Sequence, residues 1–491
     1  MEKRKKSIIK RMKMEKKLTE RIKDFQNKDF SNPEIKSEVI NLLEFLCGII
    51  EAQAAENQAL KDEINKLKGE KGKPDIKGGK KGADKKANEN KEDKMESGAK
   101  KEWQKRSKVD RIKIDREQVV KLDKAGLPDD LVFKGYEEKV VQNILIQTDN
   151  VLYKLERYYS KTEGKTYTAK LGGGLDGTEF GVETKALVST LYYENRVTEN
   201  KITSFLNSNG LIISEGTVSN ILTEEKSEEL SEIKDELVKA GLEGSEYAQI
   251  DDTGMKISGK NGYATIVCNE LFAAFYINFS KSRETVKSFL TAALAALFTV
   301  LVGDDAPQFK SIAKRFALCW VHEERHYKKL NPVFDASKAE LKRVRAQIWE
   351  YYKKLTKYKG NPTPEMKESL QNEFDTIFGQ ATGYKELDRR LQLTLSKKDD
   401  LLTVLEYPAT PLHNNLSENG VREIVMKRKI SGGVKSDAGV TAWENNMSIL
   451  ATCKKLGVSY YKFMKGVFSG TRNINLHQLI KSKKETVTIG Y

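Results

Sequence analysis

The sequence that decides the fold is Val300-Leu301-Val302-Gly303-Asp304-Asp305, an apolar run that ends in two acids. Short apolar runs of this kind are typical of buried strands. A second stretch, Ala248-Gln249-Ile250-Asp251-Asp252-Thr253-Gly254, has the same form. We therefore expect two strands that each end in a pair of acids, and the ends of two such strands can meet at one edge of a sheet.

The segments around these stretches predict the rest of the sheet. Residues 263–268 and 271–279 are strand-like, residues 282–298 are rich in Ala and Leu and predict a helix, residues 306–315 predict a short helix, and residues 316–320 predict a last strand. Three strands, a helix, a strand, a helix and a strand is the order of an RNase H-like sheet. The predicted fold class is therefore α/β, with this sheet at the centre of the domain.

A third acid lies further along the chain. The stretch Asn414-Asn415-Leu416-Ser417-Glu418 opens a predicted helix in which Glu418, Arg422, Val425 and Lys429 share one face, because they recur at spacings of four, three and four. The acid is followed by a basic cluster, Lys427-Arg428-Lys429. One acid followed by stacked basic side chains suits a metal ligand flanked by phosphate contacts.

Carboxylates in this number have a chemical use. Cleavage of a phosphodiester needs an activated water and a stabilised leaving oxygen, and a pair of Mg²⁺ ions supplies both. Magnesium prefers carboxylate oxygens and keeps some of its waters, so three acids can hold the pair and leave room for a phosphate. Acidic turns after strands are also ordinary, so the two pairs of acids alone leave a structural role open.

The motifs taken together resemble the DDE transposases of insertion-sequence family sixty-six, over roughly residues 120–465. The matching motifs are Asp251-Asp252-Thr253, Asp304 with Phe309, Cys319-Trp320-Val321-His322-Glu323-Glu324-Arg325, and Asn414-Asn415-Leu416-Ser417-Glu418 through Arg422. The resemblance implies an enzyme that cleaves and joins DNA at the ends of an insertion sequence. It also implies that Asp251, Asp304 and Glu418 are the catalytic acids and hold two Mg²⁺ (or Mn²⁺) ions.

The resemblance leaves the neighbours of these acids open. Asp252 or Asp305 could replace the adjacent aspartate as the ligand, although the spacing to Phe309 favours Asp304. Around the acids we expect supporting roles for three residues: His322, Arg325 and Asn415. A zinc site at Cys319, His322 and His326 is an alternative that lacks a fourth ligand. The family's upstream cysteine-rich segment is missing, because no cysteine lies between Cys47 and Cys268, so zinc-dependent DNA binding is not carried over.

Charge supports a nucleic-acid partner. The chain has 86 Lys and Arg against 71 acids, a net charge of +15, and such a balance favours polyanions because phosphate neutralisation releases counterions. We expect double-stranded DNA, both element ends and target, as the partner. The residues expected to bind it are Arg422, Lys427, Arg428 and Lys429.

Ahead of the predicted sheet, the chain divides into several segments. Residues 1–68 combine a basic N-terminus with a heptad pattern, residues 69–110 form a Lys-rich flexible linker, residues 111–180 are rich in short strands, and residues 181–240 are helical and helix-turn-helix-like. The heptad positions are Leu43, Ile50, Asn57 and Ile64, and Leu46, Gln53, Leu60 and Leu67. A coiled coil there predicts a homodimer or a higher synaptic complex, and a helix packed on its own domain is the alternative.

The helix-turn-helix expectation rests on a helix at residues 201–206, a turn at Asn209-Gly210, and a second helix that begins at Ser214 with Thr217. The catalytic domain is expected at residues 241–465, with a helical insertion at about 328–405. A C-terminal tail is expected at residues 466–491.

The same sequence indicates a location and leaves two rival functions. The cysteines are far apart, and the basic N-terminus has no apolar core after it, so we expect a cytoplasmic, nucleoid-associated protein without membrane partners. One rival is a catalytically silent DNA-binding protein derived from a transposase. The other is a structure-selective nuclease with an RNase H-like fold.

Overall fold

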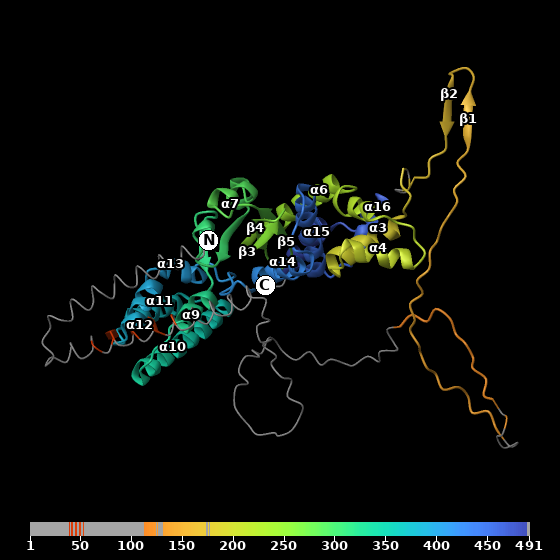
Figure 1. Cartoon of the computed structure of the whole chain (residues 1–491). Helices are drawn as coiled ribbons and strands as arrows, with labels where there is room; N and C mark the ends of the chain where they lie inside the picture. The colour runs from red at the N-terminus through yellow and green to blue at the C-terminus, as the bar shows by residue number, and fades with distance from the viewer. Residues whose placement is uncertain are drawn as a thin grey trace. The chain divides into compact units, whose positions relative to one another are not determined.

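A mixed five-stranded sheet, in the order β5-β4-β3-β6-β7, forms the centre of the computed structural model (Figure 1). The first three strands are antiparallel neighbours, whereas β6 runs parallel to β3 and β7 runs parallel to β6. The strands are β3 (Ser245–Ile257), β4 (Lys260–Cys268), β5 (Ala273–Asn278), β6 (Phe298–Gly303) and β7 (Arg315–Leu318). The expected order of strands along the chain is confirmed.

The structure describes residues 112–123, 125, 131–172, 175 and 177–488, and eight residues between 39 and 53. The chain divides into two units, residues 62–149 and the remainder. Most of the predicted coiled coil and all of the predicted linker at 69–110 lie outside the described residues.

The sequence predicts a strand that ends at Asp251 and Asp252. Strand β3 instead continues to Ile257. Its pairing with β6 stops where Gln249 lies opposite Val302, and from there β3 pairs with β4 alone. Asp251 and Asp252 therefore lie on the part of β3 that extends beyond β6, and Asp304 follows the last residue of β6. These acids lie near one another because β3 extends past the end of β6.

The connections between strands are shorter than predicted. The helix expected at 282–298 is two helices, α7 (Arg283–Phe289) and α8 (Ala292–Ala295), because the Thr291 side chain caps a new helix start. The helix expected at 306–315 is only one turn of 3₁₀ helix, Pro307–Phe309. The chain thus crosses from β6 to β7 in little space.

Two long helices cover the sheet. Helix α14 (Asn415–Ser431) packs on β3 and β4, and α15 (Asp437–Leu456) runs along β5. Side chains of α15 four residues apart accept hydrogen bonds from alternate backbone N–H groups of β5, from Ala273 to Thr452, from Phe275 to Ser448 and from Ile277 to Glu444. These bonds close the outer edge of the sheet, which would otherwise offer unpaired donors to another strand.

The helices that precede the sheet share its core with the last helices of the chain. Ser214 caps the second helix of the predicted helix-turn-helix by accepting from the N–H of Thr217, as expected. The predicted tail at 466–491 includes α17 (Leu476–Thr488), which packs against α6 (Ser227–Leu242) and has buried Leu476 and Ile480. These helices are α3 (Val182–Ser189), a π-helical turn η2 (Thr190–Glu194), α4 (Glu199–Ser208), α5 (Glu215–Thr223), α6 (Ser227–Leu242), α16 (Tyr460–Ser469) and α17 (Leu476–Thr488).

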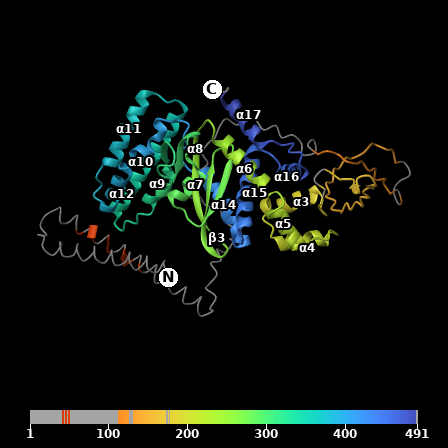
Figure 2. The same ribbon diagram turned by 90° about the horizontal axis from the view of Figure 1, so that it is seen from above.

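The insertion between β7 and α14 is helical, as predicted (Figure 2). Its buried residues form their own core, which includes Trp320. The Trp320 indole donates to the carbonyl of Leu401 and packs against the rings of Tyr351, Phe374 and Phe378. The helices are α9 (Trp320–Lys328), α10 (Asp335–Gly360), α11 (Pro364–Gly379), α12 (Lys385–Leu395) and α13 (Lys398–Leu401).

The predicted strand-rich region at 111–180 is mostly wrong. Its described residues contain one hairpin, β1 (Arg157–Ser160) and β2 (Lys165–Thr168), and no strand at 140–146. Ile144 and Leu145 are instead 91% and 81% exposed. Alternating apolar residues form a strand only where another element buries one of its faces. No described helix is both long and apolar enough to cross a membrane.

Candidate active site

Three acids from distant parts of the chain come together beside the sheet. Asp251 lies on β3, Asp304 follows β6, and Glu418 lies in the first turn of α14. Burial is the largest cause that raises the pKa of Asp251 to about 7; the charges of Asp304, Asp252 and Glu418 add to it, and a backbone hydrogen bond from Asp252 opposes it. Burial likewise raises the pKa of Asp304. The predicted acids therefore share one electrostatic environment.

Helix α14 is held over β3 by two amide side chains. The Gln249 carbonyl oxygen accepts from the backbone N–H groups of Leu416 and Ser417 at 3.0 and 3.3 Å. The amide of the same residue donates to the carbonyl of His413. From the other side, Asn414 donates to the carbonyl of Ile250 at 2.8 Å. These bonds satisfy donors at the helix start and fix Glu418 next to Asp251.

The close approach of α14 to the sheet depends on a glycine. A Cβ at Gly420 would lie 2.1 Å from Cδ1 of Ile266, which is directly opposite Asp251 on β4. Gly420 therefore lets the helix sit against the strand that pairs with the one carrying Asp251. Glu418 is one half-turn before this contact.

The structure separates Asp304 from its neighbour. Burial acts to raise the pKa of Asp305, but the lysines hydrogen-bonded to it, Lys310 at 2.8 Å and Lys397 at 2.6 Å, hold the pKa below its ordinary value. Asp305 is thus neutralised by two cations, whereas Asp304 faces His322 and Asp252. These contacts favour Asp304 over Asp305 as the metal-binding acid, in agreement with the spacing to Phe309.

Asp252 differs from Asp251 in its partners. It accepts a hydrogen bond from the Gln308 amide at 2.8 Å and pairs with Lys281 at 3.4 Å. Successive residues of a strand point to opposite faces, so Asp251 shares the face of Gln249, on which α14 is held. The arrangement favours Asp251 as the acid that meets Glu418.

Two of the three residues expected around the acids, His322 and Arg325, lie beside Glu418. His322 lies 3.6 Å from Glu418, and Arg325 contacts both His322 at 2.9 Å and Glu418 at 3.4 Å. Asn415 is exposed, and its neighbour Asn414 is the buried partner of the sheet. His326 interacts with Arg390 and Glu323 of the insertion, so it does not join Cys319 and His322 as the zinc alternative required.

A carboxylate oxygen of Glu418 has no hydrogen-bond partner among the described residues. Glu418 Oε1 is buried, and the whole side chain is only 14% exposed, yet this oxygen accepts no hydrogen bond from any described residue. Buried charges of this kind are normally paired or bind a cation. Carboxylates are the ligands that a hard divalent cation prefers, so Asp251, Asp304 and Glu418 are of the right chemical type to hold one.

Comparison with known proteins identifies the family of the chain. Residues 177–442 match the IS66 transposase family, a segment that contains all three acids. This chain belongs to that family. It is also 42% identical over 166 residues to the uncharacterized protein y4jO of Sinorhizobium fredii, which covers 34% of this chain and 51% of that protein. The chain thus matches about half the length of that relative.

Within this family member, the predicted DNA-binding residues of α14 do not all face solvent. Arg422 is exposed and donates to Asn419, Lys429 is exposed, and Arg428 reaches Thr253 on β3. Lys427 is only 2% exposed, so the prediction that it contacts DNA is wrong for this structure.

Buried Lys427 instead joins α14 to the π-helical turn η2. Its ammonium group donates to the carbonyl of Tyr192 at 2.7 Å and lies over the rings of Tyr192, Tyr193 and Trp443. Burial lowers its pKa to about 7, while the ring faces and the carbonyl favour the charged form. Neighbouring basic residues on a helix point in different directions, and only the packing of η2 and α15 decides which one is buried.

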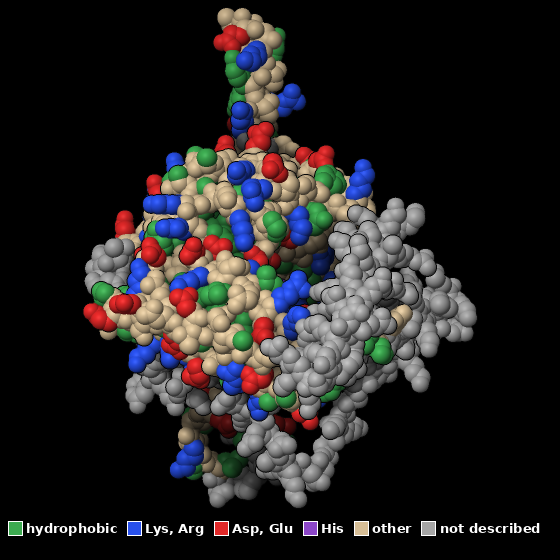
Figure 3. All heavy atoms as spheres, turned by 90° about the vertical axis from the view of Figure 1, so that its left-hand side faces the viewer, with side chains coloured by type: hydrophobic (Ala, Val, Ile, Leu, Met, Phe, Trp, Pro, Cys, Tyr) green, Lys and Arg blue, Asp and Glu red, His purple; other side chains and the backbone are tan. Residues whose placement is uncertain are grey.

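Charge alone does not mark a DNA path on the insertion. On the face of the molecule drawn in Figure 3, basic and acidic side chains are interspersed and do not gather into one stripe. Several are paired, for example Lys354 with Glu373 and Lys398 with Asp375.

Two residues of the site were missed in the sequence. Gln249 and Asn414 are both at most 1% exposed and bridge β3 and α14. A polar residue inside each of two apolar contexts was the available signal, because a buried amide requires partners.

Proposed function

We propose that the protein is a DDE-type transposase that cleaves and joins DNA at the ends of its own insertion sequence. Membership of the IS66 family supports a DNA-processing enzyme. The strand order, three antiparallel strands followed by two parallel ones, supports the RNase H-like fold.

The observation that carries the proposal is the convergence of Asp251, Asp304 and Glu418. Three carboxylates crowd together strongly enough that burial and mutual repulsion raise the pKa of Asp251 to about 7. A cluster so costly to ionise gains most from a bound cation. Among the described residues, no lysine or arginine forms an ion pair with Asp251 or Asp304, whereas Asp305 is paired with Lys310 and Lys397 and Glu418 is paired with Arg325.

The acids would hold Mg²⁺ or Mn²⁺, two ions in the proposed mechanism. When bound, such ions activate the attacking oxygen and stabilise the leaving oxygen of an in-line phosphoryl displacement. The chain's own residues set the geometry: Gln249 and Asn414 fix the start of α14, and Arg325 with His322 holds the Glu418 carboxylate.

DNA contacts are proposed on the exposed end of the same helix. Arg422 is one turn from Glu418 and lies 4.0 Å from its carboxylate, so it can reach a phosphate at the acids. Lys429 shares this face but lies about 16 Å further along the helix, so it would contact DNA beyond the acids. Arg428 lies nearer the sheet, beside Thr253. The capped helix α5 is a second candidate for DNA contact, and a homodimer or higher synaptic complex would bring two element ends together.

The test uses labelled duplexes taken from the DNA that flanks the coding region, incubated with the full chain and Mg²⁺ or Mn²⁺. We expect nicking at the 3′ ends of the element and then joined products with target DNA. Binding without nicking would support a silent DNA-binding protein, and cleavage without joined products would support a structure-selective nuclease.

The matched variant is Glu418→Gln, which keeps the shape of the side chain and removes its charge. We expect it to bind ends nearly as well as the wild type and to form no joined product. Full activity of this variant would contradict the assignment.

A further inference from the structure

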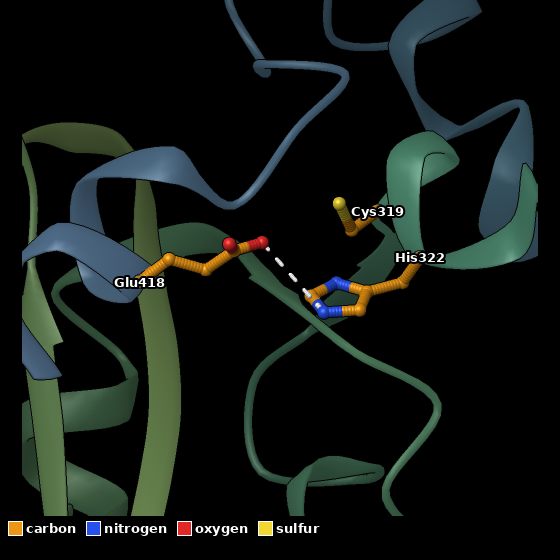
Figure 4. Close-up of side chains that lie close together, drawn as sticks. All are labelled: Cys319, His322 and Glu418. Atoms are coloured by element: carbon orange, nitrogen blue, oxygen red, sulfur yellow. Dashed lines mark ion pairs between the residues drawn. The ribbon is translucent and has the colours of Figure 1, made fainter. Parts of the chain in front are cut away.

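We infer that Cys319, His322 and Glu418 form a binding site for a soft divalent cation such as Zn²⁺, distinct in ligands from the carboxylate site that shares Glu418. The three ligand atoms lie within 4.8 Å of one another. Figure 4 shows the side chains approaching from two sides, Glu418 from α14 and the other two from the start of α9.

The fold brings this group together by two local features. Cys319 is the residue before the first turn of α9, and His322 lies three positions later, so both face the same side of that turn. Glu418 arrives from the first turn of α14, which the bonds from Gln249 and Asn414 hold in place. The backbone between the groups is further tied by the N–H of Trp320, which donates to the carbonyl of Leu412.

Two polar atoms of this group lack hydrogen-bond partners. His322 Nδ1 and Glu418 Oε1 are both buried and make no hydrogen bond with any described residue. Two of the three ligands thus carry a buried atom without a hydrogen bond, and a cation bound between the ligands would satisfy such atoms.

The ligand types select the cation. Thiolate and imidazole bind Zn²⁺ well and Mg²⁺ poorly, whereas magnesium prefers oxygen ligands throughout. One Cys, one His and one Glu make three protein ligands of a tetrahedral site, and a water can take the fourth position. Glu418 therefore takes the place that the sequence alternative gave to His326.

One cation already competes for this position. Arg325 contacts His322 and Glu418, and its side chain is 45% exposed, so it can turn toward solvent when a metal ion binds. Removing this arginine should strengthen zinc binding, because a positive charge beside the metal is lost.

The shared ligand gives the site a consequence, which rests on the proposed function. A Glu418 carboxylate engaged with zinc cannot complete the carboxylate set with Asp251 and Asp304. Zinc should therefore inhibit strand transfer in the presence of Mg²⁺, and the Cys319→Ser variant should resist this inhibition.

The binding test needs neither DNA nor turnover. The parent for all variants is the full chain with Cys47→Ser, which removes the cysteine outside the described residues. Titration with Co²⁺ should produce thiolate-to-cobalt charge-transfer absorption at one equivalent, and Zn²⁺ should displace it. Absence of this absorption in the folded parent chain would overturn the inference.

Variants then assign the ligands. We expect Cys319→Ser to abolish the charge-transfer absorption, Glu418→Gln and His322→Gln to weaken Zn²⁺ binding by about tenfold or more, and Arg325→Gln to tighten it. Cys453→Ser is the matched control, since Cys453 is also buried but lies on α15. Unchanged cobalt absorption in Cys319→Ser, or its loss in Cys453→Ser with a native thermal transition, would contradict the site.

Discussion

The Asp251→Asn substitution should stabilise the protein when no divalent cation is present. Burial and the charges of neighbouring acids raise the pKa of Asp251 from its ordinary 3.8 to about 7, so the ionised carboxylate destabilises the folded state. At pH 8 this difference corresponds to about 4 kcal/mol at about 1.4 kcal/mol per pH unit, as an upper limit. Asparagine keeps the oxygen that accepts from the N–H of Asp252, so the expected net gain is about 1–3 kcal/mol.

The pH dependence has a definite sign. Between pH 4 and 7, roughly, the folded wild type binds a proton at Asp251 that the unfolded chain has released, so wild-type stability falls as pH rises through this window. The variant lacks this group, and its advantage should grow from near zero at about pH 4 to its full value above about pH 7. Urea denaturation in EDTA at several pH values measures this difference directly.

The control is Asp305→Asn, which should act in the opposite direction. Asp305 forms ion pairs with Lys310 and Lys397, so its neutral variant should lose stability at pH 8. Added Mg²⁺ should raise the midpoint of the wild type and of Asp305→Asn but not that of Asp251→Asn. If Asp251→Asn is destabilised at pH 8 in EDTA, or its effect is independent of pH, the crowded-carboxylate reasoning fails.

Three further predictions follow from the packing of α14. Lys427→Ala should lower the free energy of unfolding by about 2–4 kcal/mol and leave the salt dependence of DNA binding unchanged. Lys429→Ala should instead keep the stability and reduce the slope of log binding constant against log salt concentration by about one. The reverse pattern would restore Lys427 as a DNA contact. Wild-type stability should also rise with pH from about 7 to 10, because the unfolded chain keeps a proton on Lys427 that burial disfavours in the folded state. This rise should vanish in Lys427→Met. A rise of equal size in that variant would mean that another group causes it. Gly420→Ala should slow DNA cleavage by pushing α14 off β4, and Ile266→Val should restore much of the rate by removing the clashing Cδ1; no recovery in the double variant would show that the contact does not position Glu418.

The sequence predicted those parts of the fold whose cause is local. The strand order, the helical insertion, the Ser214 cap and the helix that carries Glu418 all follow from apolar periodicity and capping chemistry. The end of β3 could not be predicted in this way, because it is set by the length of its neighbour β6 and not by its own residues.

The site was predicted unevenly for the same reason. Motif order predicted the three acids, but the choice between each acid and its neighbours depends on tertiary contacts. Only the contacts with Lys310 and Lys397 distinguish Asp305 from Asp304, and only the packing of η2 buries Lys427. Of the two adjacent asparagines, the hydrogen bond to Ile250 identifies Asn414.

The most direct test of the central claim is the rate of strand transfer by Asp251→Asn, Asp304→Asn and Glu418→Gln, compared with Asp305→Asn, on duplexes that carry the element ends. The proposed active site predicts that each of the first three variants loses joined product by about a thousandfold or more and still binds the ends, whereas Asp305→Asn remains within about tenfold of the wild type. Strand transfer that survives in Glu418→Gln, or that fails only in Asp305→Asn, would contradict the claim that these three carboxylates cut and join DNA.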